Sequence, residues 1–182
     1  MHHQELVAPT DDGAAIHLTG TAIPDVRLPS SRGPVRLAVL ARSRLVLYVY
    51  PRTGRPDRPA PAGWDEIPGA LGCTAQSCGF RDHAAEIAEF RGGVAGLSSQ
   101  PLDEQIEFAT RSKMPFPIIS DERRLLARRL GLPTFELTGA RYYRRLALIA
   151  EEGKIVKVFY PVLAPERSAV DIVEWLRHHA SG

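Results

Sequence analysis

The two cysteines of this 182-residue chain lie five residues apart, within the stretch GCTAQSCGFRD that begins at Gly72. Cys73 directly follows Gly72, and Cys78 directly precedes Gly79. Two cysteines at this spacing could form a structural disulfide, contribute to a metal site, act as a reactive thiol and its partner, or lie buried as inert apolar side chains. Each alternative requires different surroundings.

The histidines argue against a structural zinc site. Such a site uses about four Cys or His ligands, usually in closely spaced pairs. Five of the six histidines lie close to the two ends of the chain, and the sixth is His83. We therefore predict no metal ligand, and no bound cofactor is required by the chemistry considered below.

A permanent disulfide between Cys73 and Cys78 conflicts with the helix predicted to follow Cys73. In an unbroken helix, Cα atoms five residues apart are separated by about 8–9 Å. A disulfide requires a Cα separation below ~7 Å. A permanent bond would therefore prevent the helix from forming, whereas a transient bond would not.

The position of Cys73 favours a reactive thiol. A buried strand at 44–50 and a long loop precede a helix that begins close to Cys73. Unpaired N–H groups and the positive end of the helix dipole favour a thiolate at such a position. Cys78, about a turn and a half further along, can reach Cys73 once the helix loosens. From these features alone, two inert buried cysteines stay an open alternative.

The remaining elements predict a single α/β domain. Gly153 and the preceding glutamate indicate the turn of a hairpin over 144–160, and the last helix is predicted to begin near Pro165. Strands that alternate with helices, followed by a hairpin, predict a mixed central sheet flanked by helices. Strands are predicted at 44–50, 94–99 and 116–120, and helices beyond Cys73, at 101–113 and at 122–130, the last capped by Asp121.

Two segments are predicted to lie outside this regular structure. Residues 1–18 are polar and aperiodic, so we expect a flexible N-terminal arm before a domain that spans 19–182. Residues 23–40 predict a short strand pair around Gly33 and Pro34. The segment Gly54–Gly72 is rich in glycine and proline, and regular structure is not expected there.

The composition is that of an ordinary globular domain. Hydrophobic residues make up 44% of the chain, charged residues 24%, and the formal net charge is +2. This balance gives no reason to expect a nucleic acid or an anionic membrane as a partner. No apolar run reaches the ~18 residues of a membrane span, and residues 1–20 contain no apolar signal segment. The low cysteine content predicts a reducing compartment, the cytoplasm.

The stretch LVLYVYP at 45–51, followed by GCTAQSCGFRD, resembles the peroxiredoxins. The similarity is to the bacterioferritin comigratory protein type, also called peroxiredoxin Q. Its members have a strand ending in Tyr-Pro, a peroxidatic cysteine in a Gly-Cys-Thr step, and often a resolving cysteine five residues later, before Phe-Arg-Asp. The resemblance runs from about Thr19 to the last helix and implies a thioredoxin-like fold with the peroxiredoxin N-terminal extension.

The resemblance also implies roles for individual residues. Cys73 would be the peroxidatic cysteine, Cys78 the resolving cysteine and Pro51 the active-site proline. The family's second active-site arginine lies nine residues before the glycine of a hairpin turn. Counting back from Gly153 gives Arg144, with Arg145 as the alternative one residue further along.

The chain departs from the family pattern at the hydroxyl residue that normally lies three positions before the peroxidatic cysteine. Ala70 occupies that position, and Pro51 lies 22 residues before Cys73. We therefore place an insertion at Gly54–Gly72 and expect an ordered or semi-ordered flap, with Trp64 among its few large apolar residues. Thr53 is the favoured replacement for the missing hydroxyl; Thr74, or no hydroxyl at all, are the alternatives.

The resemblance predicts a thiol peroxidase that reduces hydrogen peroxide and small organic hydroperoxides. A disulfide between Cys73 and Cys78 would be reduced by thioredoxin or a similar dithiol protein, and the protein would be a monomer or weak dimer. A thioredoxin-like disulfide reductase is a weaker alternative, since it usually has Cys-x-x-Cys. The non-enzymatic alternative is a redox sensor or partner-binding module that docks through the Pro-rich loop and Trp64.

Overall fold

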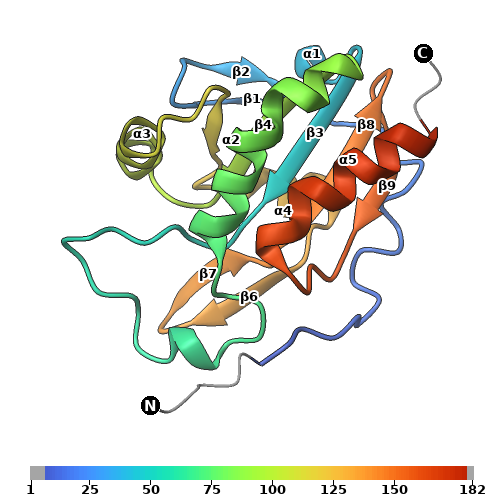
Figure 1. Ribbon diagram of the computed structural model, residues 1–182. Helices are drawn as coiled ribbons and strands as arrows, with labels where there is room; N and C mark the ends of the chain where they lie inside the picture. The colour runs from blue at the N-terminus through green and yellow to red at the C-terminus, as the bar shows by residue number, and fades with distance from the viewer. Residues whose placement is uncertain (1–6, 180–182) are drawn as a thin grey trace.

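The computed structural model describes residues 7–179, and a five-stranded mixed sheet forms its centre (Figure 1). The strands lie in the order β5-β4-β3-β8-β9. Strands β3, β4 and β5 run parallel, and β8 pairs antiparallel with both β3 and β9. The bounds are Arg44–Val49 for β3, Gly92–Ser98 for β4, Ile118–Ser120 for β5, Leu146–Glu151 for β8 and Lys154–Phe159 for β9. The predicted mixed sheet is confirmed.

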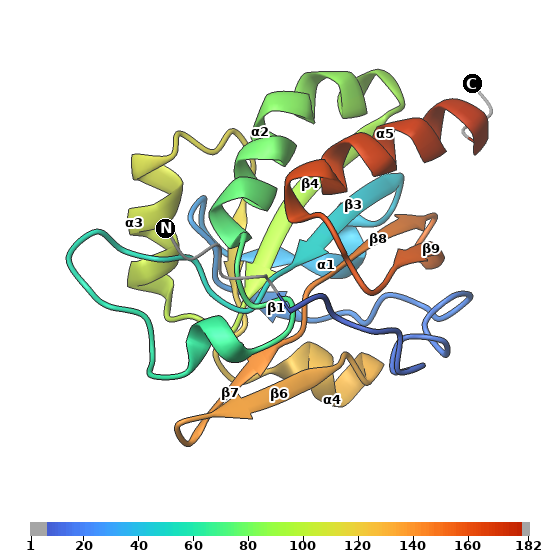
Figure 2. The same ribbon diagram turned by 60° about the horizontal axis from the view of Figure 1, so that its bottom comes forward.

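One face of the sheet packs against three helices. Because side chains alternate along a strand, Val46 and Tyr48 of β3 point to this face, together with the following Tyr50. The helices are α2 (Cys73–Glu89), α3 (Leu102–Arg111) and α5 (Ser168–His179). Figures 1 and 2 both show α5 running alongside α2. None of the helices within residues 7–179 is long and apolar enough to cross a membrane.

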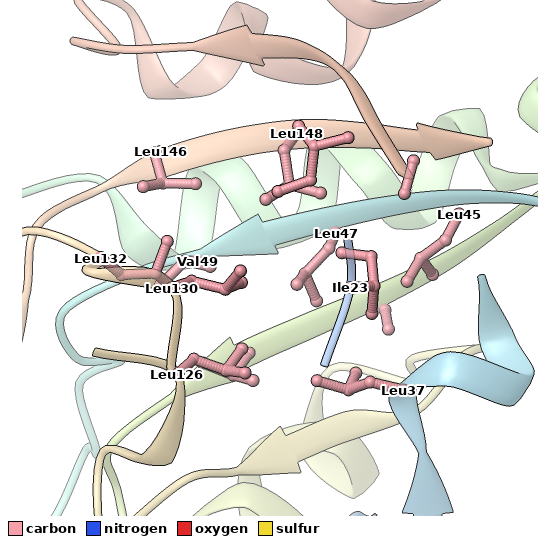
Figure 3. Packing of buried hydrophobic residues seen from close by; sticks show 14 of the residues in the cluster. Ile23, Leu37, Leu45, Leu47, Val49, Leu126, Leu130, Leu132, Leu146 and Leu148 are labelled. Atoms are coloured by element: carbon pink, nitrogen blue, oxygen red, sulfur yellow. The ribbon is translucent and has the colours of Figure 1, made fainter. Parts of the chain in front are cut away.

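The opposite face of the sheet carries the second hydrophobic cluster. Leu45, Leu47 and Val49 of β3 point to it and pack with Leu146 and Leu148 of β8 (Figure 3). Helix α4 (Leu125–Leu130) covers part of this face. The strand pair predicted around residue 33 is present as β1 (Arg27–Leu28) and β2 (Val35–Arg36), and the short helix α1 (Leu37–Leu40) follows it directly.

The described part of the predicted N-terminal arm lies against the domain. Leu18 is fully buried, and Ala15 is nearly so. His17 Nε2 lies 2.7 Å from the Leu130 carbonyl, and the Tyr160 hydroxyl donates to Asp12 at 2.9 Å. The buried apolar side chains of Leu18 and Ala15 thus fix this segment against the domain, in spite of its polar residues. Residues 1–6 of the arm lie outside the described residues.

Two hairpins follow α4, and only the second is predicted from the sequence. The turn between β8 and β9 consists of Glu152 (φ 49°) and Gly153 (φ 81°), which confirms the predicted turn. The earlier hairpin pairs β6 (Thr134–Leu137) with β7 (Ala140–Tyr143). Its strands are short and mostly half-exposed, so they lack the apolar alternation by which a strand is recognised.

Candidate active site

The start of α2 depends on Gly72. Its φ of 97° lies in the left-handed region, which side chains rarely adopt. An added Cβ would also lie 2.9 Å from Cγ of Pro165. Glycine is therefore required twice, by the backbone and by the close approach of Pro165. The helix then begins at Cys73, as the sequence predicted.

Cys73 is buried at this helix start, with 4% of its surface exposed. It packs in the cluster that contains Tyr50, at the end of β3. Its thiol donates to the Ala70 carbonyl at 3.5 Å and accepts from Nη2 of Arg145 at 3.1 Å. The sulfur thus lies between the N-terminus of α2 and a guanidinium group. The first N–H groups of a helix lack intrahelical acceptors, so both neighbours favour negative charge on the sulfur.

Arg145 is 4% exposed, and its guanidinium group donates hydrogen bonds to uncharged acceptors. Nη2 donates to the carbonyls of Gly69 (3.2 Å), Ala70 (3.3 Å) and Leu71 (2.9 Å) as well as to Cys73. Nη1 donates to Oε1 of Gln76 at 2.7 Å. Within residues 7–179, none of its acceptors is a carboxylate, and Nε has no partner. The positive charge is therefore available to an anion that forms at the sulfur.

The structure places Arg145 against Cys73, and not Arg144, so the residue obtained by counting back from Gly153 is corrected by one. The Arg144 guanidinium lies over the ring of Phe135, 5.6 Å from its centroid. Alternation along β8 gives the reason. Ala147 and Ile149 of this strand point to the face covered by α2, and Arg145 shares their parity.

Cys78 lies on the same helix as Cys73 and is half-buried. Both thiols are free. Because five helical residues separate the two Cα atoms by about 8–9 Å, the helix has to unwind before the sulfurs can bond.

Pro51 and Thr53 are both buried just after β3, but no hydrogen bond joins Thr53 to Cys73 or Arg145. The Thr53 hydroxyl lies 3.3 Å from Oε1 of Gln100, and its N–H donates to the same oxygen at 2.9 Å. The structure thus places Thr53 in a buried polar network. Position 70 has no side-chain hydroxyl, and the backbone carbonyls of residues 69–71 lie at the site instead, bound to Arg145.

The segment Gly54–Gly72 is held at its middle and at its end. Trp64 begins the 3-10 helix η1 (Trp64–Glu66), is 5% exposed, and packs edge-on against Tyr142, 5.0 Å between ring centroids. Phe135 lies 6.0 Å away on the same hairpin. The end of the segment is held by the three carbonyls that bind Arg145. Figure 1 shows the loop extending from the sheet at the lower left before it returns to α2.

Gln76 is a site residue that the sequence analysis missed. It is fully buried one turn beyond Cys73, where it bonds to Arg145. Its Nε2 donates to the Ser168 hydroxyl at 3.2 Å, at the start of α5. The sequence signal that could have identified Gln76 was its spacing of three residues from Cys73, which places both side chains on neighbouring parts of one helix face.

Within residues 7–179, no group of three or more His, Cys, Asp or Glu could hold a metal ion. His2 and His3 lie outside that range.

Comparison with known proteins identifies related sequences and structures. The family described as Redoxin matches residues 18–173. A Mycobacterium tuberculosis protein named as a peroxiredoxin is 34% identical over 116 residues, which are 63% of this chain and 66% of that relative. Peroxiredoxin Bcp of Escherichia coli K12 is 28% identical over 166 residues, 88% of this chain and 96% of the relative. The chain thus spans about two thirds of the first relative and nearly all of the second.

A solved structure has the same fold. The crystal structure of peroxidoxin BcpB from Mycobacterium tuberculosis superposes with a TM-score of 0.74 and 28% identity. The match covers 90% of this chain and 99% of that one. The predicted thioredoxin-like fold of the peroxiredoxins, a mixed sheet flanked by helices, is confirmed.

Proposed function

The chain belongs to the redoxin family, and on this premise we propose that it is a thiol peroxidase for hydrogen peroxide and small organic hydroperoxides. The names of its relatives support this activity. One observation carries the assignment of the site. The buried sulfur of Cys73 lies at the first position of α2, 3.1 Å from Nη2 of Arg145.

The first step is attack of the Cys73 thiolate on an oxygen of the hydroperoxide. The S–O bond forms as the O–O bond breaks, so that Cys73 becomes a sulfenic acid and the departing oxygen takes a proton to leave as water or an alcohol. The guanidinium of Arg145 favours the thiolate and the negative charge that develops on the departing oxygen. The carbonyls of residues 69–71 hold that guanidinium in place.

The second step forms a disulfide, and a third step restores the thiols. The Cys78 thiolate attacks the sulfenic sulfur, the S–O bond breaks, and hydroxide takes a proton to leave as water. A dithiol protein such as thioredoxin then reduces the Cys73–Cys78 disulfide and is itself oxidised. Because the cycle starts from free thiols, we keep the cytoplasm as the predicted compartment. A monomer or weak dimer remains the prediction for the oligomeric state.

The function is tested by mixing the reduced protein with one equivalent of hydrogen peroxide in a stopped-flow instrument. We expect rapid loss of peroxide and loss of two thiols per peroxide, with a Cys73–Cys78 disulfide in the peptide map. A second run with tert-butyl hydroperoxide tests the organic substrates. Slow oxidation at the rate of an ordinary cysteine would contradict the proposal and favour the non-enzymatic sensor.

The resolving step predicts faster amide exchange over residues 73–80 in the oxidised protein than in the reduced one. Gly79→Ala should slow disulfide formation about five-fold, because alanine stabilises a helix interior by about 1 kcal/mol over glycine. The added Cβ fits, since it would lie 3.4 Å from the Glu166 carbonyl and 3.8 Å from Cβ of Ala169. Equal amide protection in the two redox states would exclude the unwinding.

A further inference from the structure

The turns of α2 that separate the two cysteines lie against one short stretch of chain, Pro165–Ala169. This stretch comprises the 3-10 helix η2 (Pro165–Arg167) and the start of α5. The N-cap Gly72 and residues 76 and 79 of α2 share one helix face, because they follow each other at intervals of four and three. Contacts with the stretch occur at all three positions.

The three contacts differ in kind. Gly72 lies directly against Pro165 and leaves no room for a side chain, whereas Gly79 lies near the Glu166 carbonyl and Ala169 with room for a Cβ. Between them, Gln76 makes the only directed bond of the three, from its Nε2 to the Ser168 hydroxyl at 3.2 Å.

Gln76 therefore joins two parts of the site. Its oxygen accepts from Arg145, which binds the sulfur of Cys73. Its nitrogen donates to Ser168, which has no hydrogen bond to either of those two residues. All three polar side chains of this chain of bonds are at least 95% buried, since Gln76 is 0% exposed, Ser168 3% and Arg145 4%. A bond in such surroundings is not readily replaced by water.

We propose that the Gln76–Ser168 hydrogen bond holds the first two turns of α2 wound and so sets the rate at which Cys78 reaches Cys73. The inference rests on the proposed function, because it concerns the resolving step of that cycle. Unwinding residues 73–80 has to separate Gln76 from Ser168, whereas attack on peroxide takes place with the helix intact. Ser168 is thus a positioning residue for the second step alone.

The test is Ser168→Ala, followed by rapid-quench measurement of sulfenic acid and disulfide after one equivalent of hydrogen peroxide. We expect disulfide formation about five-fold faster, as for the loss of one net hydrogen bond, with the rate of the first oxidation unchanged. At high peroxide, the variant should also accumulate less sulfinic acid at Cys73, because the sulfenic acid is consumed sooner.

The control is Ser168→Ala in a Gln76→Met background. Methionine has a similar length but cannot bond to Ser168 or Arg145, so the serine substitution should then have no effect on resolution. Gln76→Met alone should also slow the first oxidation, because it frees Nη1 of Arg145. Melting curves and circular dichroism check that α5 remains folded.

The outcomes separate the inference from the proposed function. If the wild-type protein forms no Cys73–Cys78 disulfide, the proposed cycle itself fails. If the disulfide forms but Ser168→Ala does not accelerate it, or accelerates it equally in the Gln76→Met background, the positioning role of Ser168 is wrong.

Discussion

Replacing Cys73 by serine is expected to abolish peroxide consumption, whereas replacing Cys78 should leave the first oxidation intact. Only Cys73 lies at the start of α2 and accepts a hydrogen bond from Arg145. Cys78 lies inside the same helix and is half-buried. Without Cys78, the sulfenic acid at Cys73 has no partner on the helix, so further peroxide should oxidise it to sulfinic acid.

The two variants are compared by stopped-flow peroxide consumption and by intact mass after one and ten equivalents of peroxide. Cys78→Ser should gain the mass of one oxygen and then of two, all of it at Cys73 in the peptide map. Cys73→Ser should consume peroxide no faster than a small-molecule thiol. Oxidation of Cys78 in place of Cys73 would reverse the assigned roles.

The regular elements are predictable because their signals are local. The apolar run that forms β3 and the turn at Glu152 and Gly153 each determine structure within a few neighbouring residues. The β6–β7 hairpin gives no comparable signal. Its aromatic side chains Phe135 and Tyr142 pack against Trp64, which belongs to a loop some seventy residues earlier.

The site is predictable to the extent that it depends on position along one helix. Cys73 and Cys78 are assigned from the helix start that follows Gly72, and the structure has that start at Cys73. The choice between Arg144 and Arg145 depends on which face of the sheet each side chain meets. Strand β8 is buried on both faces, so its sequence shows no alternation from which the face could be read.

The remaining partners depend on contacts between distant segments. Gln76 and Ser168 meet because the start of α5 lies against the start of α2, and neither residue carries a pattern that pairs it with the other. The same holds for Ala70. Its carbonyl binds Arg145 and Cys73 through the backbone, so the side-chain type at position 70 gives no indication of the contact.

Arg145→Met is expected to slow reduction of hydrogen peroxide by about 100-fold or more, the usual cost of removing a charge-stabilising donor from an active site. The sulfur loses its contact with Nη2, and the carbonyls of residues 69–71 lose their donor. Arg145→Lys keeps the charge but not the planar fork, so its rate should lie between those of the wild type and Arg145→Met.

Arg144→Met is the matched control, since it removes the same group one residue earlier. The Arg144 guanidinium lies over Phe135, so the variant should stay within about three-fold of the wild-type rate, as for a substitution away from the site. Thermal unfolding of both variants distinguishes a loss of charge at the sulfur from a loosened flap. An Arg145→Met variant that melts like the wild type yet has lost the rate identifies Arg145 as the residue that acts on the reacting sulfur. Equal, small effects of the two substitutions would show that neither guanidinium does, and would leave the helix N-terminus as the main source of thiolate stabilisation.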